Sequence, residues 1–260
     1  MKIATFNVNS INARLERVLA WFDLARPDAC VLQEIKCVDE KFPAEPFEDR
    51  GYNIVVHGQK TYNGVALLSK YPIDDIVRGL PGDPADEQAR YVEALLMPEG
   101  AEPLRLCGIY LPNGNPAPGP KYDYKLAFME RLKARAAALL AHEDAFVLAG
   151  DFNVIPQTED VWDPRAWATD ALFLPASRAA FRKIVNLGFT DALRQADPDG
   201  VCYTFWDYQA GCWEKDHGIR IDHLLLSPLA ADRLIDAGVD RSERGKEKPS
   251  DHVPVWATLR

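Results

Sequence analysis

The sequence lacks the patterns that mark membrane and secreted proteins. No apolar run approaches the roughly 20 residues that are needed to cross a bilayer. The amino-terminal segment lacks the long apolar core of a signal peptide. The five cysteines are odd in number and irregularly spaced, and no CxxC pair occurs, which argues against a disulfide framework and a zinc site. We therefore expect a cytoplasmic protein with reduced thiols.

The sequence also lacks an excess of basic residues. It contains 30 lysines and arginines against 39 aspartates and glutamates, for a formal net charge of −9. A protein whose main role is to coat nucleic acid would be basic. An enzyme that acts on nucleic acid can still be acidic, because a site built from carboxylates and a divalent cation adds negative charge. Without repeats or a composition break, residues 1–260 are expected to form one domain.

Short apolar runs alternate with amphipathic segments along the chain. Strands are predicted over residues 2–9, 29–32, 52–56, 64–68, 90–97, 104–110, 145–149, 202–208, 220–226 and 250–258. Helices are predicted over residues 12–24, 121–142 and 175–187, with Asn12 capping the first. Neighbouring strands with short polar connections favour hairpin-rich mixed sheets over a pure βαβ array, so the expected class is α/β.

Polar side chains directly follow several of the apolar runs. They are Asn7, Glu34, Asp151, Asp222, Asp251 and His252. In α/β sheets, sites form where strand ends converge. Carboxylate and amide oxygens suit a hard cation such as Mg²⁺, and the set holds one histidine, which argues against zinc. Because protein-bound Mg²⁺ completes its shell with water and substrate phosphate, the pattern indicates phosphate-ester chemistry.

The segment GDFNVIP, residues 150–156, is the strongest of these strand ends. Gly150 is expected to let the backbone turn tightly where the strand finishes. Asp151 and Asn153 then lie in the following loop. Each of the polar residues taken singly is more simply explained as a turn former, a solvated charge or a structural histidine. The inference of a site therefore depends on the whole combination.

Six motifs in the chain occur in the order and spacing of the exonuclease III family. They are TFNVN (5–9), LQEIK (32–36), GIYLPNG (108–114), GDFNV (150–154), RIDHLLLS (220–227) and KPSDHVPVW (248–256). The sequence thus resembles these bacterial abasic-site endonucleases of the endonuclease/exonuclease/phosphatase superfamily from its first strand to its last. The resemblance implies a DNase I-like, four-layered α/β sandwich in which two packed mixed β-sheets are flanked by helices.

The resemblance also implies a site. Mg²⁺, which Mn²⁺ can replace, is held mainly by Glu34. The further implied metal-site residues are Asn7, Asp251, Asp151 and Asn153. Catalysis is assigned to Asp151, which activates the attacking water, with Asn153 placing it. His252 binds the scissile phosphate with Asp222 as its carboxylate partner, and Tyr110 contacts the phosphate or leaving group.

The implied substrate contacts surround this set. Asn113 matches a phosphate-contacting position, and Arg90 is a further candidate for such a contact. Phe205, Ile219 and Ile221 match the apolar pocket that the family builds for a base-less sugar. Trp206 is interpreted either as a residue that stacks in the DNA groove or as a core aromatic.

The activity implied is a Mg²⁺-dependent DNA repair nuclease that acts as a monomer on double-stranded DNA. It would cut 5′ to abasic sites and remove nucleotides or blocking groups from 3′ ends. Two alternatives stay open: a superfamily phosphoesterase with another substrate, such as a general DNase or inositol-phosphate phosphatase, and a catalytically silent nucleic-acid-binding regulator. Two departures bear on the site, since Asn9 replaces an aspartate and Ile219 replaces a tryptophan of some members.

Overall fold

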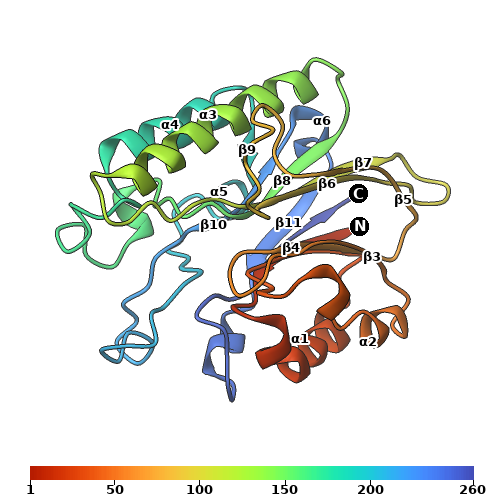
Figure 1. The fold of residues 1–260 in the computed structure, drawn as a ribbon, viewed down its shortest axis with the longest axis horizontal. Helices are drawn as coiled ribbons and strands as arrows, with labels where there is room; N and C mark the ends of the chain where they lie inside the picture. The colour runs from red at the N-terminus through yellow and green to blue at the C-terminus, as the bar shows by residue number, and fades with distance from the viewer.

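Two six-stranded β-sheets pack face to face in the computed structural model, which describes residues 1–260 (Figure 1). Sheet A contains, in spatial order, β11 (Leu234–Val239), β12 (Val255–Leu259), β1 (Lys2–Asn7), β2 (Ala29–Gln33), β4 (Val65–Ser69) and β3 (Asn53–His57). Sheet B contains β5 (Ile73–Arg78), β6 (Tyr91–Leu96), β7 (Leu104–Tyr110), β8 (Phe146–Asp151), β10 (Asp222–Leu226) and β9 (Thr190–Asp191). The central pairs β1–β2 and β7–β8 are parallel and the other pairs antiparallel, so both sheets are mixed.

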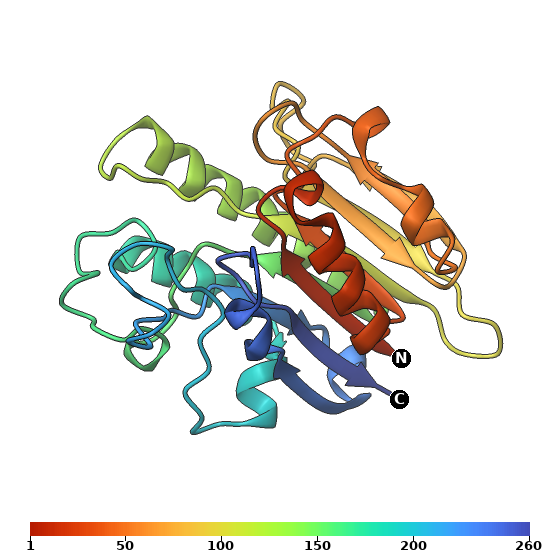
Figure 2. The same ribbon diagram turned by 90° about the horizontal axis from the view of Figure 1, so that it is seen from below.

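Helices cover the outer face of each sheet. On sheet A these are α1 (Ile11–Ala25) and α2 (Glu45–Glu48), and on sheet B they are α3 (Pro120–Leu140) and α4 (Pro175–Val185) (Figures 1 and 2). The short helices α5 (Ala192–Ala196) and α6 (Pro228–Ala231) flank β10. No helix has both the length and the apolar character that crossing a membrane requires. The four layers confirm the predicted DNase I-like sandwich.

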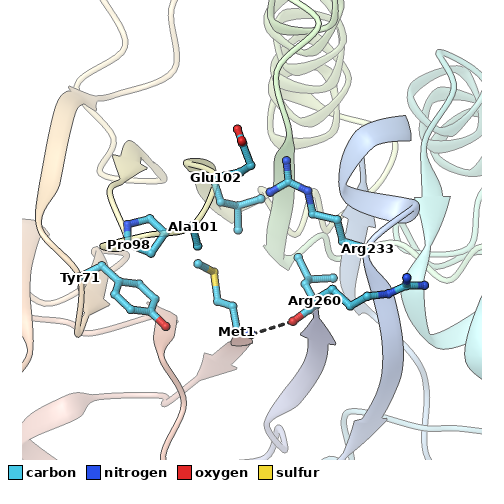
Figure 3. Close-up of a pocket in the computed structure, with 9 residues that line it drawn as sticks. Met1, Tyr71, Pro98, Ala101, Glu102, Arg233 and Arg260 are labelled. Carbon is cyan, nitrogen blue, oxygen red and sulfur yellow. Dashed lines mark hydrogen bonds between the residues drawn. The ribbon is translucent and has the colours of Figure 1, made fainter.

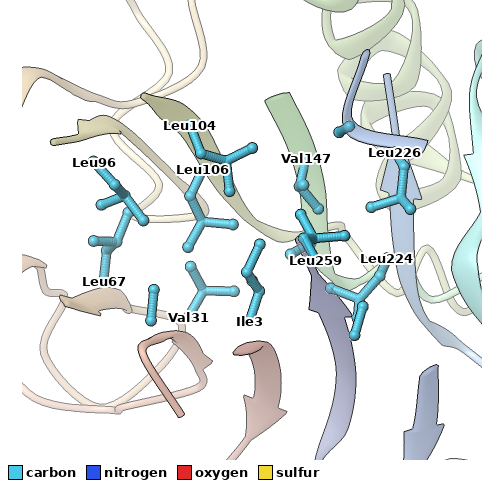
Figure 4. Close-up of a cluster of buried hydrophobic side chains, with 14 of the residues drawn as sticks. Ile3, Val31, Leu67, Leu96, Leu104, Leu106, Val147, Leu224, Leu226 and Leu259 are labelled. Atoms are coloured by element: carbon cyan, nitrogen blue, oxygen red, sulfur yellow. The ribbon is translucent and has the colours of Figure 1, made fainter. Parts of the chain in front are cut away.

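The main core lies between the two sheets and contains 22 buried apolar residues (Figure 4). Ile3, Val31 and Val147 face this inner core, while Cys30 and Leu148 face the helices on the outside. Because both faces of the central strands are buried, these strands form nearly continuous apolar runs instead of alternating with polar residues. This explains why they could be predicted from the sequence.

A close contact between the sheets occurs at Gly108 of β7. A Cβ atom at this position would lie 2.9 Å from Cγ1 of Val31 in β2, on the opposite sheet. The absence of a side chain at Gly108 therefore lets the two central parallel pairs approach each other.

Several sequence predictions differ from the structure. Strands β5 and β11 were not predicted, because their side chains are mostly exposed or half-buried and do not form an apolar run. The aromatic segment 202–208, predicted as a strand, forms only isolated bridges from Phe205 to Ile219 and His252. The N-cap of α1 is Ser10, whose Oγ accepts a hydrogen bond from the Ala13 amide, in place of Asn12.

Candidate active site

The polar strand ends converge at one edge of the sandwich. The parallel strands β1 and β2 of sheet A lead to Asn7 and Glu34, and β7 and β8 of sheet B lead to Tyr110 and Asp151. Strand β10 runs antiparallel to β8, so its first residue, Asp222, lies opposite Asp151. The site therefore forms where the carboxyl ends of two parallel pairs meet.

Asn7 links the two sheets across this edge. Its Nδ2 atom donates to Oε1 of Glu34 and to Oδ2 of Asp151, both at 2.9 Å. Its Oδ1 atom accepts from the Asn9 amide at 3.1 Å. Asn7 thus lies where the metal site was predicted, but its nitrogen faces the carboxylates. In this arrangement it holds Glu34 and Asp151 together and does not present a ligand oxygen.

Glu34 follows β2 in the left-handed backbone region, with a φ of 52°. Its Oε2 atom lies 2.9 Å from Nζ of Lys36, which also donates to Oδ1 of Asn9 at 2.5 Å. Burial raises the pKa of Glu34, but the charge of Lys36 and the Asn7 hydrogen bond outweigh it, and the pKa lies below its ordinary value. Glu34 is therefore ionised at neutral pH.

Asp151 is buried at the end of β8. Its Oδ1 atom accepts from the Asn153 amide at 2.8 Å. Burial, together with the nearby carboxylates Asp222 and Glu34, raises the pKa of Asp151 to about 7, although His252 opposes the shift. The preceding glycine has a different role from the one predicted: a Cβ at Gly150 would lie 1.9 Å from the Ile109 carbonyl oxygen, so the close approach of β7 requires glycine.

His252 lies between two aspartates. Its Nδ1 atom is 2.9 Å from Oδ2 of Asp222, and its Nε2 atom is 3.7 Å from Oδ2 of Asp151. Burial lowers the pKa of His252, but the charges of Asp222 and Asp151 outweigh burial and raise the pKa to about 10. The predicted Asp222–His252 pairing is thus present in the structure, and the imidazole is protonated at neutral pH.

The residues present fit a hard divalent cation. Glu34 and Asp151 each offer a carboxylate oxygen, and these oxygens and a ring nitrogen of His252 lie within 4.8 Å of one another. Because the imidazole is protonated, the carboxylates are the groups that could bind a cation. The Oδ1 atom of Asp222 is buried without a hydrogen-bond partner, so the site carries negative charge that its own donors do not satisfy. Carboxylate oxygens of this kind favour Mg²⁺-like ions.

Two predicted metal-site residues have other partners. Oδ1 of Asp251 accepts from Nδ2 of Asn9 at 3.2 Å and from Oγ of Ser250 at 3.3 Å, outside the Glu34–Asp151–His252 group. In the side chain of Asn153, Nδ2 donates to the Leu111 carbonyl at 2.9 Å, and Oδ1 accepts from Nδ2 of Asn113 at 3.2 Å. Asp251 and Asn153 therefore border the site in this structure.

Three predicted substrate contacts lie beside these groups. The guanidinium of Arg90 lies over the Tyr110 ring, 4.8 Å from its centroid. Burial, and then the carboxylates of Glu34 and Asp151, raise the pKa of Tyr110 well above its usual value, which keeps the phenol protonated. Asn113 is exposed, and its contact with Asn153 connects it to the loop that follows β8.

The apolar residues that were predicted to form the sugar pocket differ in exposure. Phe205 is half-buried and meets the His252 ring edge to face, with centroids 5.0 Å apart. Ile219 and Ile221 are buried in the adjoining apolar cluster. Trp206 is fully buried, and its Nε1 atom donates to Oδ1 of Asp216 at 2.9 Å, so the structure assigns it to the core instead of a DNA-stacking surface.

Two contacts at the site were not predicted. Lys36 neutralises the charge of Glu34. Ser250 donates from Oγ to the Asn7 carbonyl at 2.7 Å and accepts from the backbone N–H of His252 at 3.2 Å. Both residues fall within the quoted motifs LQEIK and KPSDHVPVW. Both residues could therefore have been identified from their positions inside these motifs.

A separate cavity of about 340 Å³ lies at the opposite strand ends, beside Met1 and Leu259 (Figure 3). Glu102 is the only acidic side chain in its lining, which contains no histidine. This cavity therefore lacks the group of carboxylates and imidazole that defines the candidate site.

Comparisons with known proteins agree with this geometry. The sequence model of the endonuclease/exonuclease/phosphatase family matches residues 4–252, and the chain belongs to that family. It is 34% identical, over the full length of both chains, to exodeoxyribonuclease III of Haemophilus influenzae. On this basis the chain is of the exonuclease III type and is a hydrolytic DNA repair nuclease.

Two solved structures are very similar to the whole chain. One is an AP endonuclease from Archaeoglobus fulgidus, with a TM-score of 0.94 and 38% identity. The other is a variant of the 3′ phosphatase NExo from Neisseria bound to a product DNA hairpin, with a TM-score of 0.95 and 39% identity. Each comparison covers 100% of this chain and 99% of the other.

Proposed function

We propose that the chain hydrolyses phosphate esters of double-stranded DNA with Mg²⁺ as its cofactor. It acts as a monomer, cuts the backbone 5′ to abasic sites, and removes nucleotides and blocking groups from 3′ ends. The observation that carries this proposal is the group of Asp151, His252 and Glu34, with Asp222 bonded to His252. The names of similar proteins, an AP endonuclease and a 3′ phosphatase bound to DNA, support the substrate class.

Glu34 is the main residue that would hold the Mg²⁺. The bound ion would lower the negative charge of the phosphate and so reduce its repulsion of an anionic nucleophile. Asn7 fixes Glu34 relative to Asp151 through its two hydrogen bonds. This places the metal ligand and the proposed general base on opposite sides of one amide group.

Asp151 accepts the proton of the attacking water. Burial and the neighbouring carboxylates raise the pKa of Asp151, which makes it a stronger base than an ordinary aspartate. Asn153 donates its backbone N–H to Oδ1 of Asp151 and so leaves Oδ2 facing His252. The proposed direction of attack is therefore from the Asp151 side of the site.

His252 donates a hydrogen bond to a phosphate oxygen from Nε2. Asp222 accepts from Nδ1, which fixes the ring orientation and keeps the imidazole protonated. Fixed positive charge beside the phosphate stabilises the charge that develops in the transition state. Tyr110, whose phenol stays protonated, is proposed to donate to the phosphate or the leaving oxygen.

Incision of a defined duplex tests the proposal. A labelled duplex with one tetrahydrofuran abasic analogue is incubated with the protein and Mg²⁺, and separately with EDTA. We expect cleavage 5′ to the analogue that leaves a 3′-hydroxyl and disappears in EDTA. A second duplex, nicked and carrying a 3′-phosphate, tests removal of blocking groups.

The control is Asp151→Asn, which should keep the fold by circular dichroism and bind DNA by fluorescence anisotropy but lose nearly all turnover. No cleavage by the natural protein with Mg²⁺ would contradict the proposed activity. Cleavage that persists in the variant would show that Asp151 is not the general base.

A further inference from the structure

Lys125 is fully buried beneath the candidate site. It lies on the apolar side of α3, at the same heptad spacing as Tyr122, Met129, Leu132, Ala136 and Leu139. Its Nζ atom donates to two backbone carbonyls, that of Asn113 at 2.9 Å and that of Asn153 at 2.6 Å. A basic side chain thus occupies a position where the sequence pattern calls for an apolar one.

Stability alone does not explain this lysine. Removing an ammonium group from water is unfavourable, and apolar replacements for buried charges are often neutral or stabilising. Burial lowers the pKa of Lys125 to about 7, against the opposing effect of Asp151 and Asp170. An apolar side chain in the stripe of α3 would avoid this cost, so the benefit of the lysine must come from what it binds.

The two carbonyls belong to the two loops that carry site residues. Asn113 lies in the loop after β7, and Asn153 lies in the loop after β8. Their side chains meet through the 3.2 Å hydrogen bond from Nδ2 of Asn113 to Oδ1 of Asn153. Gly114 makes room for the lysine, because a Cβ there would lie 2.7 Å from Cδ of Lys125. The loop after β7 is therefore fitted around the buried side chain.

We propose that Lys125 is a positioning residue for the nuclease reaction, because it fixes the loops after β7 and β8 relative to each other. This inference rests on the proposed function. Lys125 binds the backbone carbonyl of Asn153, and the backbone N–H of the same residue donates to Asp151. The lysine therefore also helps to hold this N–H in place. Loss of Lys125 leaves both loops attached to the fold but lets Asn113 and Asn153 shift relative to the bound phosphodiester.

The test uses Lys125→Met, which keeps the length of the side chain and removes its charge and donors. The matched control is Lys133→Met, two turns further along α3, where the lysine is part of a surface pair with Glu130. Steady-state incision of the abasic duplex gives kcat and KM for each variant, per folded molecule as measured by circular dichroism. We expect kcat per folded molecule to fall at least tenfold in Lys125→Met, with KM changed less than threefold, whereas Lys133→Met keeps both values.

A double-mutant cycle separates positioning from general packing. If Lys125 acts through Asn113, the loss in the combined Lys125→Met and Asn113→Ala variant should be at least threefold smaller than the product of the two single losses. Lys125→Gln, which retains one donor group, should lose less activity than Lys125→Met and provides the test if the Met variant does not fold. A kcat per folded molecule equal to that of the natural protein, or a fully multiplicative cycle, overturns the proposal. If the natural protein itself cuts none of the substrates, the proposed function fails and not this inference alone.

Discussion

Asp151 and Asp222 lie directly opposite each other in the antiparallel pairing of β8 and β10, and one imidazole contacts both carboxylates. Two buried carboxylates at this spacing would repel each other strongly without a cation between or beside them. The protonated His252 supplies one positive charge. The three carboxylates of Asp151, Asp222 and Glu34 still outnumber the positive charges of His252 and Lys36, so net negative charge remains at this edge and suits a divalent metal ion.

Asp222→Asn should lower kcat by on the order of 10²–10⁴-fold, as in other carboxylate–histidine pairs. Removing the negative charge lowers the pKa of His252 and leaves its ring orientation unfixed. NMR titration of His252 measures the pKa, and incision of the abasic duplex measures kcat. Asp232→Asn, on an exposed residue after α6, is the control. An unchanged His252 pKa in Asp222→Asn would contradict the assigned pairing.

Glu34→Gln should raise the Mg²⁺ concentration for half-maximal activity at least about tenfold, because it removes a charged ligand. Binding of Mn²⁺, followed by the electron paramagnetic resonance signal of the free ion, gives a readout that does not depend on turnover. Glu99→Gln, an exposed residue in the turn between β6 and β7, should behave like the natural protein. Equal metal affinity in the two variants would remove Glu34 from the metal site.

Gly150→Ala should lower the free energy of unfolding by roughly 3 kcal/mol, because the added Cβ collides with the Ile109 backbone. Gly51→Ala is the control, because it introduces backbone strain without a steric clash. Gly51 has a φ of 81° but no atom within 4 Å of a Cβ, so roughly 1–2 kcal/mol is expected there. Urea unfolding measures both values. A smaller loss at Gly150 than at Gly51 would show that the strands can separate at little cost.

Asp191→Asn should reduce the free energy of unfolding at neutral pH by about 3 kcal/mol. It should also make this free energy depend less on pH in the acid range. Oδ2 of Asp191 lies 2.6 Å from Nη1 of Arg220; burial raises the pKa of this carboxyl, but Arg220 and His223 outweigh it and lower the pKa. A depressed folded-state pKa adds stability above the unfolded value of about 4, and this stability is lost as the pH falls through the folded value.

Urea unfolding between pH 6 and pH 3 measures the effect of Asp191. The natural protein should lose more stability over this range than Asp191→Asn, whereas Asp199→Asn, an exposed neighbour in the following loop, should match the natural protein. Parallel curves for all three proteins would show that the Asp191–Arg220 pair does not control acid stability.

The central strands could be predicted because burial on both faces makes their sequences continuously apolar. The main helices could be predicted because their apolar residues recur at helical spacing. Edge strands such as β11 could not, because their stability comes from backbone pairing to a neighbour and leaves mixed side chains. The aromatic segment 202–208 was wrongly predicted as a strand. Its apolar residue Trp206 is buried by packing within a loop, and the segment forms only isolated bridges.

The convergence of the polar strand ends could be predicted from the sequence, but the orientation of these side chains and the residues that support them could not. The roles assigned to the individual residues stay predictions. The side-chain direction of Asn7 depends on the Asn9 amide, which local spacing does not reveal. Lys125 was not predicted as a site residue, although its helical spacing with the apolar residues of α3 is visible in the sequence. The network around Glu34 also depends on Lys36 and Asn9, and it becomes defined only after β1 and β2 pair.

The close contact between Gly108 and Val31 has a consequence for the candidate site at the carboxyl ends of the same strand pairs. Sheet A supplies Glu34 and sheet B supplies Asp151, so the separation of these carboxylates follows the spacing of the sheets. Side chains in the inner core thereby influence the geometry of the candidate metal site without touching it. The rate of DNA cleavage should then report on core packing, and hydrostatic pressure or a change of inner-core volume should alter catalysis before the protein unfolds.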